Sequence, residues 1–132
     1  MQTCPGSIVL VSDAPDILTA LREIFRESGW YMREARAISE LPQLFNERSP
    51  SVILTDDFLP DGGWLDVLAM AGAICPEARI LVTGKLSDYA LWAEVLNRGG
   101  FDVLAQPLDS VEVLRVASSA LLSSHWKAGR AS

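Results

Sequence analysis

Five short apolar runs alternate with amphipathic stretches along this chain, and this alternation restricts the possible folds more than any other feature. We predict strands at residues 7–11, 30–35, 52–55, 79–83 and 102–105. Runs that are apolar at successive positions are typical of strands covered on both faces. We predict helices at residues 15–27, 39–47, 64–74, 89–97 and 110–123. The alternation therefore predicts an α/β fold, in which a doubly wound, five-stranded parallel sheet lies between two layers of helices.

Residue types at the ends of the helical stretches support these boundaries. Pro15 suits the first turn of the first helix, with Asp13 or Ala14 near its cap and Gly29 as its stop. Ser39 is the expected N-cap of the second helix. The sequence thus marks its helices locally as well as by periodicity.

Composition excludes several classes of protein. A chain of 132 residues with 49% hydrophobic and 21% charged residues is long and apolar enough for one domain with its own core. Its net charge of −6 argues against direct nucleic-acid binding. The N-terminal segment has no basic region, and no apolar run approaches the ~18 residues of a membrane span. We therefore expect a cytoplasmic protein with no membrane contact.

The sequence offers little for cysteine, histidine or nucleotide chemistry. Cys4 and Cys75 form no disulfide framework, and His125 is the single histidine, which argues against zinc sites and Ser-His or Cys-His catalysis. The turn after the first strand, residues 12–16, reads SDAPD and lacks the glycines of a phosphate-binding loop. The commonest nucleotide-binding interpretations of an alternating α/β chain are thus removed.

Polar side chains end or directly follow four of the five expected strands. These pairs are Ser12-Asp13, Asp56-Asp57, Thr83-Gly84 and Gln106-Pro107. Ligands of an open parallel sheet bind beyond the carboxyl ends of its strands, so the sequence predicts that these groups converge at one edge. Converging carboxylates repel one another unless a cation is bound, and oxygen ligands favour Mg²⁺ over zinc.

Four segments of the chain resemble the receiver domains of response regulators. The segments that carry the resemblance are IVLVSDAPDIL, PSVILTDDFLPDGG, ARILVTG and GGFDVLAQPLD, in the same order and strand positions as in that family. The resemblance runs from residue 7 to about residue 124. It implies a flavodoxin-like fold like that of the chemotaxis regulators, and a signalling role in a two-component phosphorelay rather than an enzyme.

The resemblance also implies a role for each matching residue. Asp56 would be the phosphoacceptor, and Mg²⁺ would be held by Asp13, Asp56 and the backbone carbonyl of Phe58. Thr83 would bond to a phosphoryl oxygen and move upon phosphorylation. Asp57 alternates to the opposite face, where a turn or capping role is expected.

Three departures from the family pattern concern the same chemistry and suggest a receiver that is degenerate in part. Ser12 stands where receivers usually carry an acid, Gln106 where they carry lysine, and Val103 where they carry an aromatic residue. We expect weaker Mg²⁺ binding from the first and a weaker contact to the phosphoryl group from the second. Lys85, two residues beyond Thr83, is a speculative replacement for the lysine; a solvated loop lysine is the alternative.

We expect residues 1–124 to form the receiver domain and residues 125–132 a C-terminal tail, so that output passes to another domain or chain. The expected phosphodonor is a histidine kinase or phosphotransfer protein. The expected output surface comprises the fourth helix, fifth strand and fifth helix, which could also support a homodimer. On that helix, Tyr89 and Trp92 are either core residues or an exposed contact site.

Two alternative functions remain open from the sequence. The first is a pseudo-receiver that acts as a protein-interaction module without phosphorylation. The second is a Mg²⁺-dependent phosphohydrolase. The latter is weaker because Asp56 and Asp57 are adjacent, whereas such enzymes place one residue between their two aspartates.

Overall fold

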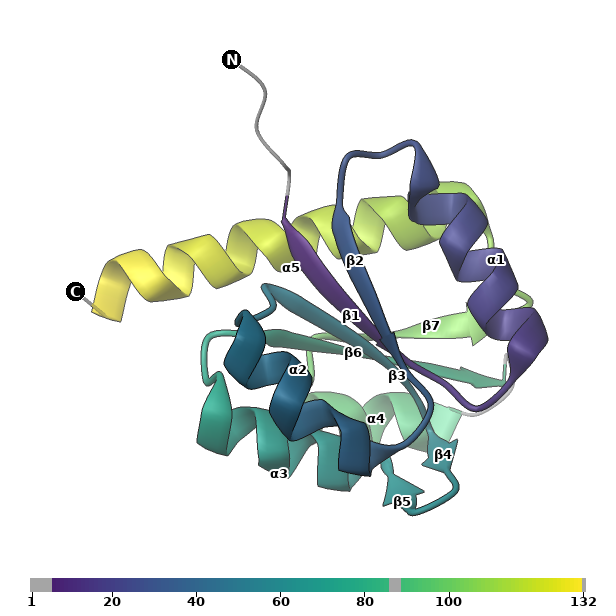
Figure 1. Ribbon diagram of the computed structural model, residues 1–132, viewed down its shortest axis with the longest axis horizontal. Helices are drawn as coiled ribbons and strands as arrows, with labels where there is room; N and C mark the ends of the chain where they lie inside the picture. The colour runs from purple at the N-terminus through teal and green to yellow at the C-terminus, as the bar shows by residue number, and fades with distance from the viewer. Residues whose placement is uncertain (1–5, 86–88, 132) are drawn as a thin grey trace.

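A five-stranded parallel sheet forms the centre of the computed structural model (Figure 1), as the sequence predicts. The structure describes residues 6–85 and 89–131, with side chains described for 6–84 and 89–124. The sheet has the order β2-β1-β3-β6-β7, from Tyr31–Ala35, Ser7–Val11, Val52–Asp56, Arg79–Lys85 and Asp102–Gln106. The helices are α1 (Pro15–Arg26), α2 (Leu41–Glu47), α3 (Trp64–Ile74), α4 (Tyr89–Asn97) and α5 (Ser110–Ala131).

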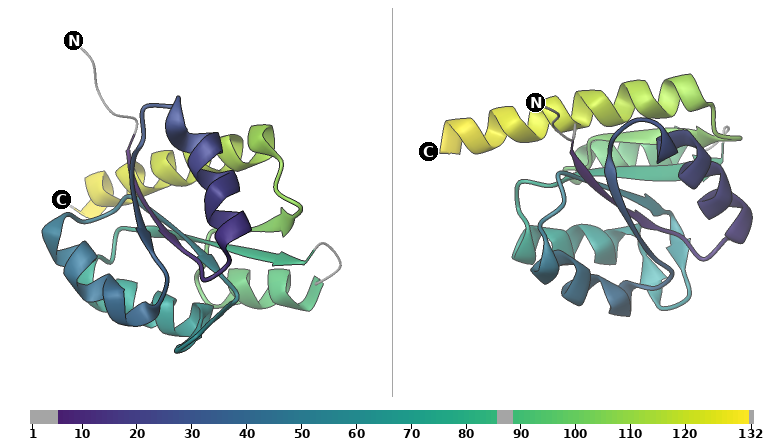
Figure 2. Two further views of the ribbon diagram at one scale, coloured as in Figure 1. Left: turned by 45° about the vertical axis from the view of Figure 1, so that its right-hand side comes forward. Right: turned by 45° about the horizontal axis from the view of Figure 1, so that its top comes forward.

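The helices cover the two faces of the sheet and make three layers (Figure 2). Alternate residues of each strand point to opposite faces, so Ile8 and Leu10 of β1 pack with α1 and α5, while Val9 and Val11 pack with α2, α3 and α4. Every residue of β1 and β3 is buried. This burial explains why the central strands are apolar at successive positions.

The strand order places β1 and β3 side by side at the point where the chain winds in opposite directions across the sheet. Ligands of such sheets bind outside the carboxyl ends of these two strands. Asp56, the last residue of β3, is paired in register with Thr83 of β6. The topology therefore brings together residues that lie far apart in the sequence.

A short hairpin after β3 was not predicted. Strands β4 (Phe58–Leu59) and β5 (Gly62–Gly63) pair antiparallel, and the Asp61 carboxylate between them accepts hydrogen bonds from the backbone of Ile38 and Ser39, at 2.9 and 3.0 Å. These bonds hold the pKa of Asp61 below its usual value. They also tie the hairpin to a 3₁₀ turn, η1 (Ile38–Glu40).

Several expected ends of helices are corrected by the structure. Ser39 is not an N-cap, because it lies inside η1 and Glu40 takes the cap position of α2. Ala14, rather than Asp13, is the N-cap of α1. Helix α5 continues to Ala131, so residues 125–131 are helical and not the unstructured tail that we expected.

The aromatic residues divide between the core and the surface. Trp30 and Trp64 are buried in the core. Tyr89 and Trp92 are 75% and 40% exposed and stack with ring centroids 5.5 Å apart, which resolves the open alternative in favour of a surface position. Leu91 and Val95 form the inward face of α4, whereas Leu96 is exposed.

The helices of the described residues include none that is both long and apolar enough to span a bilayer.

Candidate functional site

Asp56 lies at the centre of a small hydrogen-bonded network at the carboxyl edge of the sheet. Its side chain accepts a bond from Ser12 Oγ at 2.5 Å to Oδ2, and from Thr83 Oγ1 at 2.7 Å to Oδ1. Gln106 Nε2 lies 3.3 Å from Thr83 Oγ1, and the Ala14 backbone nitrogen lies 3.1 Å from Ser12 Oγ. Residues at the ends of β1, β3, β6 and β7 thus meet as predicted.

The direction of each hydrogen bond follows from its outer partners. A hydroxyl group has one hydrogen to donate and lone pairs to accept. The oxygen of Thr83 accepts from the Gln106 amide, and that of Ser12 accepts from the Ala14 N–H, so both hydroxyl hydrogens are free for Asp56. Asp56 is therefore held as an acceptor at both oxygens, an arrangement that we call the hydroxyl clamp.

Burial and hydrogen bonding act in opposite directions on the pKa of Asp56. The residue is only 8% exposed, and the loss of solvation raises the pKa of its carboxyl group above the usual value. The bonds from Ser12 and Thr83 oppose this rise in pKa, while the negative charges of Asp57 and Asp16 add to it. An aspartate held in this way at the end of a core strand is a strong candidate for chemistry.

The proposed metal ligands are only partly gathered. Asp13 is exposed directly after β1, whereas Ser12, which precedes it, is buried against Asp56. Within the described part of the chain, no three His, Cys, Asp or Glu side chains lie close enough to hold a metal ion. Mg²⁺ needs only one or two carboxylates when waters and a phosphate complete its shell, so the oxygens of Asp13 and Asp56 fit this ion by their chemistry.

The other candidate residues differ in how close the structure places them to Asp56. Gln106 lies beside Asp56 but reaches it only through Thr83. The Lys85 side chain falls outside the described residues. The backbone carbonyl of Asp57 accepts the Trp64 N–H at 3.2 Å, and its side chain lines a pocket next to the clamp.

Sequence reasoning missed two roles near Asp56. Ser12 was expected at this edge of the sheet and as a departure from the family pattern, but not as a hydrogen-bond donor to Asp56, to which it lies closer than Thr83 does. Asp16 in the first turn of α1 contributes a negative charge that acts on Asp56. The signal for both was their proximity in sequence to the end of β1, where ligands of this fold bind.

Comparisons with known proteins agree with this geometry. The model of the response regulator receiver domain matches residues 8–118. The chain is 27% identical over 118 residues to the DNA-binding transcriptional regulator NtrC of Azospirillum brasilense, covering 89% of this chain and 24% of that protein. It is 22% identical over 114 residues to the chemotaxis protein CheY of Listeria monocytogenes, covering 86% of this chain and 96% of CheY.

The share of each similar protein that this chain covers varies. The photosynthetic apparatus regulatory protein RegA of Rhodobacter capsulatus is 28% identical over 107 residues, covering 81% of this chain and 58% of RegA. The chain therefore spans about a quarter of NtrC and somewhat more than half of RegA. Among solved structures, the receiver domain of an HD domain-containing protein from Pseudomonas fluorescens Pf-5 superposes with a TM-score of 0.87 at 24% identity, covering 98% and 96% of the two chains. With its sheet order and the position of Asp56, the match over residues 8–118 shows that this chain belongs to the response regulator receiver domain family.

Proposed function

We propose that this domain accepts a phosphoryl group on Asp56 from the phosphohistidine of a histidine kinase or phosphotransfer protein. A carboxylate oxygen of Asp56 forms a bond to phosphorus while the P–N bond breaks, and the imidazole nitrogen keeps the electron pair. The observation that carries the proposal is the position of Asp56, buried at the carboxyl end of β3 and held at both oxygens by hydroxyl donors. Positioning and charge neutralisation are what phosphoryl transfer requires of a protein.

The neighbouring residues receive roles that follow from their places. Asp13, Asp56 and the Phe58 carbonyl are the proposed ligands of Mg²⁺, which supplies positive charge to the phosphoryl oxygens when bound. Thr83, already 2.7 Å from Asp56 Oδ1, is the proposed donor to a phosphoryl oxygen. Gln106 orients the Thr83 hydroxyl, and we propose Lys85 as a nearby cation.

The proposed output surface comprises α4, β7 and α5. The exposed, stacked pair of Tyr89 and Trp92 on α4 supports this assignment, because aromatic residues are enriched at protein interfaces. A phosphoryl group adds up to about two negative charges and strong acceptor oxygens next to Thr83 at the end of β6. Helix α4 begins six residues after Thr83 in the chain, so a shift of Thr83 has a short path to the output surface. We propose that the domain works in the cytoplasm, through another protein or domain.

Intact-mass measurement after incubation with Mg²⁺ and acetyl phosphate tests this function. We expect one added phosphoryl group on the unmodified protein and none on the Asp56→Asn variant. Asp57→Asn is the matched control, because it removes the adjacent carboxylate without touching the clamp, and it should still gain the group.

Two results would contradict the proposal. If the folded protein gains no phosphoryl group, it acts as a protein-interaction module without phosphorylation. If it turns over varied phosphate esters catalytically, it is a phosphohydrolase. Circular dichroism of each variant distinguishes a loss of chemistry from a loss of fold.

A further inference from the structure

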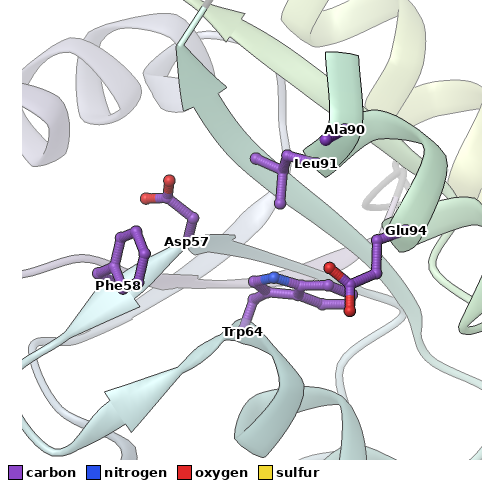
Figure 3. Close-up of a pocket in the computed structure, with 6 residues that line it drawn as sticks. All are labelled: Asp57, Phe58, Trp64, Ala90, Leu91 and Glu94. Carbon is purple, nitrogen blue, oxygen red and sulfur yellow. The ribbon is translucent and has the colours of Figure 1, made fainter. Parts of the chain in front are cut away.

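A pocket of about 340 Å³ opens beside the hydroxyl clamp, between the end of β3 and helix α4 (Figure 3). It is lined by Asp57, Phe58, Trp64, Ala90, Leu91 and Glu94. In Figure 3 the Glu94 carboxylate overlaps one end of the Trp64 indole, and the Asp57 carboxylate lies farther away, nearer the Phe58 ring. Four of the six lining residues are apolar or aromatic, and the other two carry negative charge. We call this the Asp57–Glu94 pocket.

The two carboxylates have little compensation within the described residues. Asp57 uses its backbone carbonyl to accept the Trp64 N–H, and no described side chain forms an ion pair with its carboxylate. Glu94 faces Arg98 one turn later at 3.7 Å, with both side chains about half exposed. Exposed helical pairs of this kind are weak and exchange readily with other partners. The lining of the pocket therefore contains two negative charges that other described side chains compensate only weakly.

This lining selects for one class of ligand. A phosphate or carboxylate group would be repelled by both acids, and a neutral apolar group would desolvate them without compensation. A cation gains from the negative charge of both carboxylates. A guanidinium group suits the site better than an ammonium group, because it is flat and weakly hydrated, so it can pack against the apolar lining while donating to a carboxylate.

We propose that the Asp57–Glu94 pocket binds an arginine side chain presented by a partner protein. The volume of the pocket lies at the lower end of the range for small-molecule sites, and it suits a single long side chain. Phe58 at its rim is 80% exposed, which leaves apolar surface that a lone cation would not cover but that residues flanking an arginine would. The proposal does not rest on phosphorylation of Asp56, and its test uses neither Mg²⁺ nor a phosphodonor.

Nuclear magnetic resonance titration with three probes tests the proposal. The probes are the tripeptide N-acetyl-Leu-Arg-Leu-amide, the same tripeptide with citrulline in place of arginine, and N-acetylarginine amide. We expect the arginine tripeptide to shift the Trp64 indole N–H and the backbone amides of Ala90 and Glu94. Citrulline keeps the shape of arginine but not its charge, so binding should weaken about fivefold or more. N-acetylarginine amide should also bind more weakly than the tripeptide, because it lacks the residues that would cover Phe58.

Matched variants locate the binding in the pocket. Asp57→Asn and Glu94→Gln should each weaken the binding of the arginine tripeptide about two- to fivefold. Glu112→Gln is the control, because Glu112 of α5 also faces an arginine one turn later, Arg115 at 3.6 Å, but lies outside the pocket. It should leave the affinity unchanged.

Four outcomes would overturn the proposal. Absence of binding by the arginine tripeptide would remove it, as would equal binding of the citrulline tripeptide. Unchanged affinity in both pocket variants, with native spectra, would place the binding elsewhere. Equal affinity for N-acetylarginine amide and the arginine tripeptide would assign the pocket to a small cation instead of a partner protein.

Discussion

Replacement of Ser12 by alanine removes one arm of the hydroxyl clamp without adding bulk. Ser12 is buried, and its Oγ lies 2.5 Å from Asp56 Oδ2. The variant leaves a buried, ionisable oxygen without its donor. A hydrogen bond to a charged group contributes about 1.5–3 kcal/mol. We expect the free energy of unfolding at neutral pH to fall by about that amount, measured by urea denaturation.

The same change should strengthen the binding of Mg²⁺. Oδ1 of Asp56 faces β6, where Thr83 donates to it, and Oδ2 faces the end of β1, where Asp13 follows Ser12. An ion held by Asp13 and Asp56 would therefore compete with the Ser12 hydroxyl for Asp56. If loss of the Ser12 hydroxyl makes the free energy of Mg²⁺ binding more favourable by about 1.4 kcal/mol, the affinity for Mg²⁺ rises about tenfold. Isothermal titration calorimetry with MgCl₂ measures this change.

The direction of the effect separates two roles for Ser12. If its hydroxyl were a metal ligand, Ser12→Ala would weaken Mg²⁺ binding. Ser12→Thr retains a hydroxyl group and should restore an affinity close to that of the unmodified protein. Unchanged or weaker binding by a folded Ser12→Ala variant would refute the competition argument.

Three further predictions concern stability. The pKa of Asp56 is raised on folding, mainly by burial, so the native state binds more protons than the unfolded state. The protein should therefore lose stability as the pH rises from the usual pKa of aspartate through this raised pKa. Asp56→Asn should reduce that loss, measured by urea denaturation at a series of pH values. Thr83→Ala removes the donor to Oδ1 and the acceptor of Gln106, which should lower stability by about 1.5–3 kcal/mol in the same assay, while Thr83→Ser should recover most of it. Gly29→Ala should lower the melting temperature, because Gly29 has a φ of 86°, which alanine adopts only with strain. Gly72→Ala in α3 should instead raise the free energy of unfolding by about 0.5–1 kcal/mol, because an added Cβ there meets nothing within 4 Å.

The sheet and the meeting of the clamp residues could be predicted because they depend on period and topology. Buried strands must be apolar at successive positions, and parallel strands must bring their carboxyl ends to one edge. These two rules predict that Ser12, Asp56 and Thr83 lie close together at the carboxyl edge of the sheet. The fold therefore followed from patterns that each segment carries by itself.

The remaining features depend on contacts that no local pattern encodes. Strands β4 and β5 have two residues each, too few for a period, and the hairpin is anchored by Asp61 to η1, 22 and 23 residues earlier in the chain. The donation from Ser12 to Asp56 depends on how β1 and β3 pair. The Asp57–Glu94 pocket likewise depends on how the end of β3 and helix α4 lie in the fold.

Ser12 and Gln106, two departures from the family pattern, both favour the unphosphorylated state of Asp56 over the phosphorylated state. Ser12 removes a negative charge and Gln106 a positive one, so the formal charge around Asp56 is unchanged while fewer charges are desolvated. Neutral donors are cheaper to bury than ions, which favours the resting clamp. A phosphoryl group adds up to about two negative charges, and it then meets one cation fewer than in a typical receiver. The phosphorylated state therefore depends more strongly on Mg²⁺ and on charge from outside the clamp, and a guanidinium group beside Asp57 would supply such a charge at the residue next to Asp56.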